Sequence, residues 1–272
     1  MRLFYKHFRH GRYEFNSNCF RRTTVGGILR KTSRACSVRV ETSTRGIRGR
    51  VNVVLFGATG MVGAGVLIEC LDDPRVESVL VVGRRSCDVV HPKLRELIRS
   101  DLFDFGDAPD DLLNLDACFF CLGVSAVGMS EAEYHRVTYD LTVATAESLL
   151  DVNPALTFCY VSGEGTDSTE RGRLMWARVK GGTENQLLRM PFTAYMFRPG
   201  YIQPLRGVSS RLRVYRAMHA VIGPFYPLLA RLLPKHVTTT VNVGRAMIEV
   251  AAQGHTKLVL ENPDINALAV VV

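Results

Sequence analysis

The sequence predicts an α/β fold: a doubly wound parallel sheet in a single domain, with a mainly helical region on the substrate side from about residue 201. Three observations lead to this prediction. An apolar strand at 51–56 runs directly into a glycine-rich turn, and strand-like and helix-like segments alternate from there to about residue 200. The 272 residues are also 47% hydrophobic, which is enough for one large core. Alternating strands and helices require mainly parallel strands joined by right-handed crossovers.

The first strand and its turn, at 51–63, read VNVVLFGATGMVG and have the pattern of a phosphate-binding turn. Gly57 permits a tight turn, Gly60 lets a pyrophosphate approach the backbone, and Gly63 lets the next helix pack closely on its strand. The free N–H groups and the helix dipole then attract phosphate. The spacing, G-x-x-G-x-x-G, differs from the commonest dinucleotide pattern, and an ordinary βα turn is the alternative. The residues of this turn expected to contact a dinucleotide are Gly57, Thr59, Gly60, Met61, Val62 and Gly63.

Further elements follow in order along the chain. Predicted strands lie at 78–82, 102–105, 116–122, 156–161, 192–197 and 257–260. Predicted helices lie at 91–99, 174–188 and 241–252. Another helix begins at Ser130, because Ser130 and Glu133 have the spacing of a capping box. The apolar stripe expected to be buried along that helix is Val137, Leu141, Ala144 and Leu149.

Ligands of doubly wound sheets bind outside the carboxyl ends of the strands, near the point where the strand order reverses. We therefore expect the site in the loops that follow the predicted strands. Besides the first turn, the residues expected to contact a cofactor there are Arg84, Arg85, Leu122, Gly123, Pro199, Gly200 and Ile202.

The end of the second strand indicates which dinucleotide is bound. A free ribose 2′-hydroxyl is usually recognised by a carboxylate at this place, about 20 residues after the glycines. Here the chain has Arg84 and Arg85 instead. Guanidinium groups form paired hydrogen bonds with phosphate, so the sequence predicts NADP(H) in preference to NAD(H). Two solvated loop arginines are the alternative.

Several short motifs occur in the order found in one enzyme superfamily. They are GATGMVG, Cys121-Leu122-Gly123, Val161-Ser162-Gly163, Val179-Lys180-Gly181 and Phe197-Arg198-Pro199-Gly200. Over about residues 51–268 the chain resembles the short-chain dehydrogenase/reductase superfamily. More narrowly, it resembles the atypical branch that includes Tat-interacting oxidoreductase-like proteins and bacterial nucleoside-sugar-epimerase relatives. This resemblance implies an NAD(P)-binding Rossmann fold and an oxidoreductase or epimerase activity.

The resemblance also implies a catalytic tyrosine four residues before a lysine, and a serine at the preceding strand end. Lys180 matches the lysine, which would hold the nicotinamide ribose, and Ser162 matches the serine. The residue four places before Lys180 is Trp176, however. An indole N–H has no acid–base equilibrium near neutral pH, so the usual proton donor is absent. Position 176 shares a helix face with position 180, and we expect Trp176 to stack on nicotinamide or to wall the pocket.

Other groups could replace the proton donor, and those that border the predicted cleft are Tyr139, Tyr160, Tyr201 and Glu164. The predicted catalytic set is Lys180, Ser162 and Glu164, with Ser162 or Glu164 polarising the substrate oxygen. An ordinary strand-end role for Ser162 and a solvated Lys180 are the alternatives.

The basic charge of the chain lies in its first residues. Residues 1–50 carry 13 Lys or Arg and two acids, whereas residues 51–272 have a net charge of −3. We divide the chain into a basic, disordered tail at 1–49 and an NAD(P)-binding domain at 50–272. The tail is interpreted as an organellar targeting segment, a non-functional extension or an arm for phosphate backbones. A cytoplasmic location is expected, or an organellar one if the tail is a transit segment.

Cysteines, histidines and apolar runs narrow the class of protein. The seven cysteines lack the spacing of a disulfide scaffold, and Cys118 and Cys121 would point to opposite faces of one strand. The histidines show no metal-ligand spacing, so no metal is predicted. No apolar run of about 18 residues suggests a membrane span. The apolar segment at 220–233 is expected to cover a substrate pocket or, as an alternative, to lie on a membrane surface.

Three classes of function fit these features. The first is an NADP-dependent oxidoreductase or epimerase that acts on an unidentified small carbonyl or alcohol through a replacement acid. The second is an NADPH-sensing or scaffold protein that has lost efficient hydride chemistry. The third is a nucleic-acid or membrane-surface binder led by the tail, and the −3 charge of residues 51–272 counts against it. The expected partner is a small-molecule substrate, and a homodimer is left open.

Overall fold

The strands form one seven-stranded sheet in the order β3-β2-β1-β4-β5-β6-β9. The computed structural model describes residues 50–103, 110–208 and 223–270. The strands of this sheet are β1 (Val51–Phe56), β2 (Val76–Gly83), β3 (Leu94–Ile98), β4 (Ala117–Phe120), β5 (Thr157–Val161), β6 (Thr193–Arg198) and β9 (Val259–Glu261). Every neighbouring pair is parallel. The order reverses between β1 and β4, so the predicted doubly wound α/β fold is confirmed.

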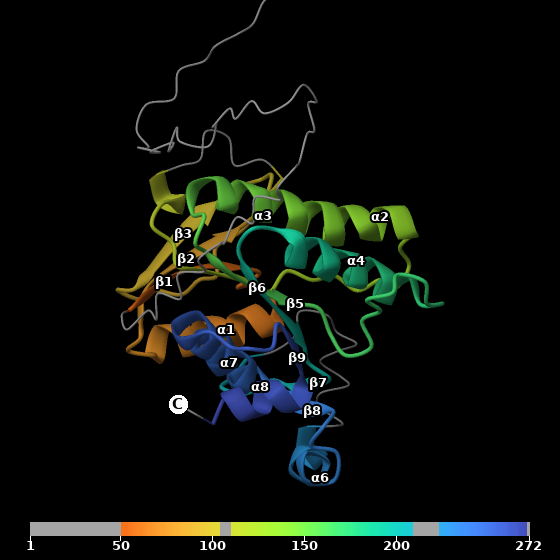
Figure 1. Cartoon of the computed structure of the whole chain (residues 1–272). Helices are drawn as coiled ribbons and strands as arrows, with labels where there is room; N and C mark the ends of the chain where they lie inside the picture. The colour runs from red at the N-terminus through yellow and green to blue at the C-terminus, as the bar shows by residue number, and fades with distance from the viewer. Residues whose placement is uncertain (1–49, 104–109, 209–222, 271–272) are drawn as a thin grey trace, which may run out of the picture. The chain divides into compact units, whose positions relative to one another are not determined.

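Helices cover both faces of this sheet, as Figure 1 shows. One face carries α1 (Met61–Asp72), α7 (Thr240–Gln253) and α8 (Asn262–Leu268). The other face carries α2 (Glu131–His135), α3 (Leu141–Val152) and α4 (Met175–Arg189).

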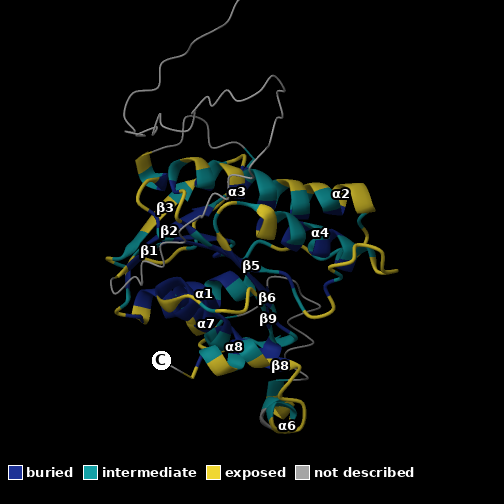
Figure 2. Ribbon diagram, viewed as in Figure 1, coloured by how far each residue is buried: buried dark blue, intermediate teal, exposed yellow. Residues whose placement is uncertain are grey.

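The core consists of two apolar clusters, one on each face of the sheet (Figure 2). Alternate residues of β1 belong to different clusters: Leu55 packs in the cluster that includes Val66 of α1, and Phe56 in the cluster that includes Leu149 of α3. This explains why β1 is an almost continuous apolar run.

Helices α1 and α7 approach each other at two glycines. A Cβ added to Gly65 would lie 2.4 Å from Cβ of Thr240, and one added to Gly244 would lie 2.9 Å from Cβ of Glu69. Only glycine allows backbones to pack at this separation, so these two residues set the distance between the helices.

The predicted helix at 91–99 is wrong, because this segment contains the edge strand β3, which pairs with β2. Its leucines have a spacing that also suits a helix. In the strand, however, Leu94 packs against one core cluster and Leu97 against the other. The strand predicted at 102–105 is also wrong for the two residues that the structure describes, which form a bend, and 104–105 lie outside the described residues.

The helix predicted after Ser130 is confirmed at its start, since Ser130 and Glu133 form the capping box. Of its predicted buried stripe, Leu149 is buried and Leu141 is half-buried against the core, whereas Val137 and Ala144 are half-buried and belong to neither core cluster. A π-helical turn at Arg136–Asp140 separates α2 from α3, and its extra residue rotates the face that follows. The residues that are buried along this helix are Tyr134, Thr138, Thr142, Thr145, Ala146 and Leu149. Threonine is tolerated there because its hydroxyl donates to a backbone carbonyl of the preceding turn, as the hydroxyl of Thr145 does to Leu141 at 2.8 Å.

The region after residue 200 contains a second sheet that the sequence did not predict. It consists of β7 (Tyr201–Gln203) and β8 (Val237–Thr239), which pair in parallel. Three-residue strands carry too little periodicity to be recognised. Helix α6 (Tyr226–Leu232) precedes β8.

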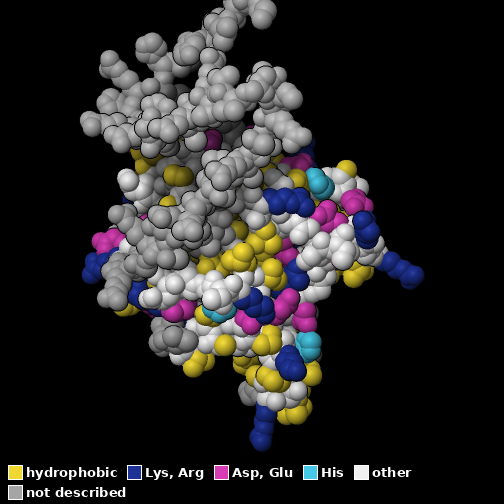
Figure 3. All heavy atoms as spheres, in the orientation of Figure 1, with side chains coloured by type: hydrophobic (Ala, Val, Ile, Leu, Met, Phe, Trp, Pro, Cys, Tyr) yellow, Lys and Arg dark blue, Asp and Glu magenta, His cyan; other side chains and the backbone are white. Residues whose placement is uncertain are grey.

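Several further predictions concern the surface of the chain. Figure 3 shows hydrophobic and basic side chains over α6, where Leu228 and Leu232 are exposed beside Arg231. The predictions that the segment at 220–233 covers a pocket or lies on a membrane surface both stay predictions, and residues 220–222 lie outside the described residues. Residues 1–49 also lie outside them.

Over the described ranges, no helix has the length and apolar character needed to cross a membrane. Cys118 and Cys121 contact different core clusters, which confirms that they point to opposite faces.

Candidate cofactor and active site

The turn between β1 and α1 has room for glycine alone at two of its positions. Gly57 has a φ of +85°, and a Cβ there would lie 2.7 Å from the carbonyl of Cys121. A Cβ at Gly63 would lie 2.2 Å from the carbonyl oxygen of Gly57. The first contact fixes the turn against β4, and the second fixes α1 on its own strand.

Gly60 is different, because the space beside it is open. A Cβ there would meet only the carbonyl oxygen of Gly57, at 3.3 Å. Gly60 is the N-cap of α1, and no side chain caps this end or places an acid in the first turn. Free amides, a positive helix end and an uncrowded approach together fit a diphosphate. Of the other predicted contacts in this turn, Thr59, Met61 and Val62 are half-buried, and Val62 packs against the core.

Arg84 and Arg85 directly follow β2 at the edge of this turn. Both side chains are exposed, and neither makes a hydrogen bond or ion pair with another described residue. The nearby carboxylate comes from β3: Glu96 accepts from the hydroxyl of Ser86 at 2.8 Å and from the amide of Cys87 at 2.7 Å. The Cys87 amide lowers the pKa of Glu96. Sequence reasoning missed this acid, because its segment was predicted to be a helix.

The loops after β4, β5 and β6 bring most of the other predicted contacts to the same edge of the sheet. Leu122 packs against the core just beyond β4, and Gly123 follows it at the surface. The loops after β5 and β6 are joined directly, because the amide of Glu164 donates to the carbonyl of Pro199 at 2.9 Å. Ile202 lies in β7, in the second sheet.

Lys180 of α4 reaches back to the loop after β5, where its Nζ donates to the carbonyl oxygen of Ser162. Burial lowers the pKa of Lys180 to about 8, while the negative charge of Glu184 acts in the opposite direction. Lys180 is thus held against the sheet rather than solvated on the helix surface.

Ser162 is buried, and its hydroxyl donates to Oε1 of Glu184 at 2.5 Å. Glu184 is itself buried and forms a close ion pair with Arg198 at the end of β6. The hydrogen bond from Arg198 to the Glu184 carboxylate in this ion pair raises the pKa of Arg198. In this structure the Ser162 hydroxyl is therefore engaged by Glu184, and its predicted contact with substrate stays a prediction. Sequence reasoning missed Glu184, although its spacing of four from Lys180 places both on one helix face.

Trp176 is half-buried at the first turn of α4, and its six-membered ring would lie 3.5 Å from a Cβ added to Gly165. The indole therefore lies against Gly165, in the loop after β5. A wall of the substrate pocket and stacking on nicotinamide both stay predictions for Trp176.

The three tyrosines considered as proton donors lie in different places. Tyr160 is buried, and burial raises its pKa. The Tyr201 hydroxyl donates to Gln203 at 2.9 Å, and burial raises its pKa as well. The ring of Tyr139 stacks on the ring of His135, with 4.6 Å between the two ring centroids.

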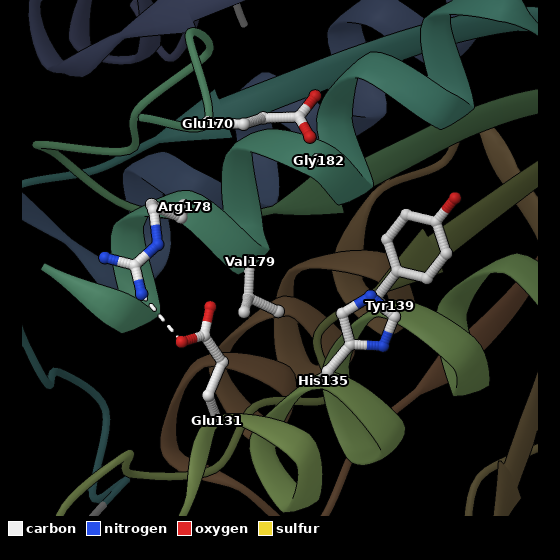
Figure 4. A pocket seen from close by; sticks show the side chains of 7 residues that line it. All are labelled: Glu131, His135, Tyr139, Glu170, Arg178, Val179 and Gly182. Carbon is white, nitrogen blue, oxygen red and sulfur yellow. Dashed lines mark hydrogen bonds and ion pairs between the residues drawn. The ribbon is translucent and has the colours of Figure 1, made fainter. Parts of the chain in front are cut away.

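Tyr139 lines a hollow of about 310 Å³ between α2 and α4 (Figure 4). The ion pair of Arg178 and Glu131, at 2.7 Å, closes one side of it. None of its lining residues is a predicted cofactor contact, so this hollow is separate from the glycine turn.

Glu164, the remaining candidate, pairs with a residue that sequence reasoning missed. Its Oε1 contacts Nδ1 of His236, which directly precedes β8. The two residues are 72 positions apart, and no local pattern links them.

Comparison with known proteins supports the same fold. No family model matches the chain. The Bordetella bronchiseptica enzyme WbmF, solved in complex with NAD+, superposes with a TM-score of 0.55 at 17% identity, over 80% of this chain and 77% of that one. A short-chain dehydrogenase family protein from Francisella tularensis gives a TM-score of 0.53 at 10% identity, over 76% of this chain and 95% of that one.

The chain thus has the Rossmann-type α/β fold of these two structures, and the fold that the resemblance implied is confirmed. In sequence, it is similar to the protein fmp52, mitochondrial, of Emericella nidulans. The two are 26% identical over 166 residues, which make up 58% of this chain and 70% of that protein.

Proposed function

We propose that this chain binds NADP(H) and acts as an oxidoreductase or epimerase on a small carbonyl or alcohol. The observation that carries the proposal is the glycine turn, where Gly57 and Gly63 fix the backbone and Gly60 leaves the end of α1 open. That WbmF was solved with NAD+ in the same fold supports a nicotinamide dinucleotide.

Several of the predicted contacts have a definite part in this proposal. The amides of the turn bind the diphosphate, and Arg84 and Arg85 bind the 2′-phosphate, for which their exposure and lack of described partners leave them free. Lys180, held by the carbonyl of Ser162, orients the nicotinamide ribose. The cofactor, when bound, supplies or accepts a hydride. Glu164 lies on the same loop and is the accessible member of the predicted catalytic set, since 41% of its side chain is exposed.

The choice of cofactor is tested by titrating the full chain with NADPH and NADH and following the fluorescence of Trp176, the only tryptophan. We expect tighter binding of NADPH, and Arg84→Asp should weaken NADPH by on the order of tenfold or more, because a carboxylate repels the 2′-phosphate and accepts from a free ribose. Arg95→Asp, at an exposed position of β3 where the arginine pairs with Asp111 at 3.0 Å, is the control for the reversal of charge. An unchanged preference in Arg84→Asp would contradict the assignment.

Trp176 favours a second candidate, an NADPH-sensing or scaffold protein. It occupies the place of the usual catalytic tyrosine and cannot donate a proton near neutral pH. Trp176→Tyr separates the two candidates, because only an enzyme that lacks a good acid should turn over carbonyl substrates faster when the phenol is restored. If the wild type and Trp176→Tyr both bind NADPH but neither reduces a carbonyl substrate, the sensor is favoured.

An organellar location is part of the proposal. The name of the Emericella nidulans relative includes the word mitochondrial, which supports interpreting residues 1–49 as a targeting segment. Fractionation of cells that express the full chain tests this, and recovery in the cytosol alone would contradict it.

A further inference from the structure

Two accessible titratable side chains meet at the carboxyl end of the sheet. Nδ1 of His236 and Oε1 of Glu164 form a close hydrogen-bonded pair, and 58% of the His236 side chain and 41% of the Glu164 side chain are exposed. A small molecule can therefore reach this pair, in contrast to Tyr160, which is 1% exposed.

The backbone holds both partners of the pair. The amide of Glu164 donates to Pro199, and the carbonyl of His236 accepts from the amide of Tyr201 at 2.8 Å. Gly200 lies between them, and a Cβ there would come within 2.5 Å of Oε2 of Glu164 and 2.2 Å of the carbonyl oxygen of His236. The loop after β6 thus needs glycine at 200 for the pair to form at all.

The pair also lies beside the groups assigned to the nicotinamide end of the cofactor. Lys180 binds the carbonyl of Ser162, two residues before Glu164, and Trp176 covers Gly165, the residue after it. The loop after β5 therefore contains the carbonyl that binds Lys180, the acid Glu164, and the glycine against which Trp176 lies.

We propose that His236, oriented by Glu164, is the proton donor and acceptor of this site. An ionised carboxylate only accepts hydrogen bonds, so Nδ1 of His236 carries a proton and Nε2 is the nitrogen left for a substrate. His236 is the catalytic residue, and Glu164 is its positioning residue. This inference rests on the proposed oxidoreductase function and names the replacement acid that it requires.

The step balances in both directions. In reduction, the carbonyl carbon receives a hydride from the reduced dinucleotide, the π pair of the C=O bond moves to oxygen, and protonated His236 gives its Nε2 proton to that oxygen. An alcohol, the oxidised dinucleotide and neutral His236 result, and His236 takes up a proton from water. In oxidation, neutral His236 removes the hydroxyl proton as the hydride leaves the carbon.

The test is His236→Ala in the full chain, assayed for NADPH oxidation with a panel of aldehydes and ketones. His255→Ala is the matched control, because its ring is half-buried in the loop between α7 and β9 and contacts Lys257 there. We expect turnover by His236→Ala to fall by on the order of a hundredfold. The NADPH affinity, followed by Trp176 fluorescence, and the Tm should stay close to those of the wild type, and imidazole in the buffer should restore part of the turnover.

Glu164 is tested separately, since it acts through the histidine. Glu164→Gln keeps a hydrogen-bonding group of the same shape but removes the charge, and we expect lower kcat with little change in NADPH affinity. Glu164→Asp should recover part of that loss. Equal turnover of Glu164→Gln and the wild type would contradict the positioning role.

The remaining outcomes separate this inference from the function on which it rests. Unchanged turnover in His236→Ala would overturn the inference alone, and so would loss of turnover together with NADPH affinity and Tm, which would make the pair a structural tie. A wild-type chain that binds NADPH but reduces no carbonyl of the panel would overturn the oxidoreductase function and the inference with it. A chain that does not bind NADPH would overturn the cofactor assignment first.

Discussion

The burial that positions Lys180 for its proposed role in binding the cofactor also lowers the stability of the folded chain, because it removes water from a charged group. Its contact with Ser162 places a cation where the nicotinamide ribose is proposed to bind, but burial lowers its pKa to about 8. The folded chain therefore releases this proton at lower pH than the unfolded chain does. Below that pKa both states carry the proton, and the charged form is held in the fold at its full desolvation cost.

A pH dependence follows with a definite sign. Between pH 8 and the ordinary lysine range near 10.5, the unfolded state binds more protons at Lys180 than the folded state, so stability from this group rises with pH. We expect the Tm of the wild type, relative to Lys180→Met, to increase as pH rises from 7 to about 10. A difference in Tm that stays constant over that range would contradict the shifted pKa.

At the scale of single residues, only part of the site could be predicted from the sequence. The glycines and Lys180 were found because each carries a local pattern: a turn spacing or a distance from a motif. His236 has no local signal, since its partner Glu164 is 72 residues away and meets it only through the fold. The engagement of Ser162 by Glu184 was also invisible, because sequence alone does not show which hydroxyls are already satisfied.

At the scale of elements, the packing of α1 on α7 depends on Glu69 as well as on glycine. Glu69 is buried beside Gly244 and accepts from Arg206 at 2.8 Å and from Arg245 at 3.0 Å. These two ion pairs hold its side chain in place, so it has little freedom to yield to a larger neighbour.

We therefore expect Gly244→Ala to destabilise the chain by about 1–3 kcal/mol, despite the higher helix propensity of alanine. The new Cβ would lie 2.9 Å from both Cβ and Cγ of Glu69. Thermal or denaturant unfolding measures the change. Gly182→Ala in α4 is the control, because its Cβ would meet only the flexible end of Glu170, at 3.3 Å. Equal stability of Gly244→Ala and Gly182→Ala would contradict the claim that Glu69 is held too firmly to move aside.

Elements whose apolar residues fit only a strand or only a helix were predicted well. Elements whose apolar spacing fits both were not. β1 and α7 have unmixed patterns, and their ends were predicted to within a few residues. The segment of β3 has apolar residues three apart, which a strand covered on both faces and an amphipathic helix share. The π-helical turn before α3 shifted a buried face that the sequence pattern placed on other residues.

At the scale of the whole molecule, the fold concentrates the candidate site at one edge of the sheet. The order of strands reverses between β1 and β4, and the glycine turn lies directly after β1. β7 and β8 then bring His236 to the loops after β5 and β6. The topology was predictable from alternation, whereas the contribution of the second sheet was not, because its strands are three residues long.

The central claim is that the open amides after β1 bind the diphosphate of a dinucleotide, and Gly60→Ala tests it most directly. The new methyl meets only the Gly57 carbonyl oxygen, at 3.3 Å, and otherwise fills the space left for the ligand. Calorimetric titration with NADPH should show binding weakened by about tenfold or more, which is about 1.4 kcal/mol or more. The Tm of the free protein should stay close to that of the wild type, apart from the small cost of alanine at an N-cap. NADPH affinity equal to that of the wild type in a folded Gly60→Ala would contradict the account.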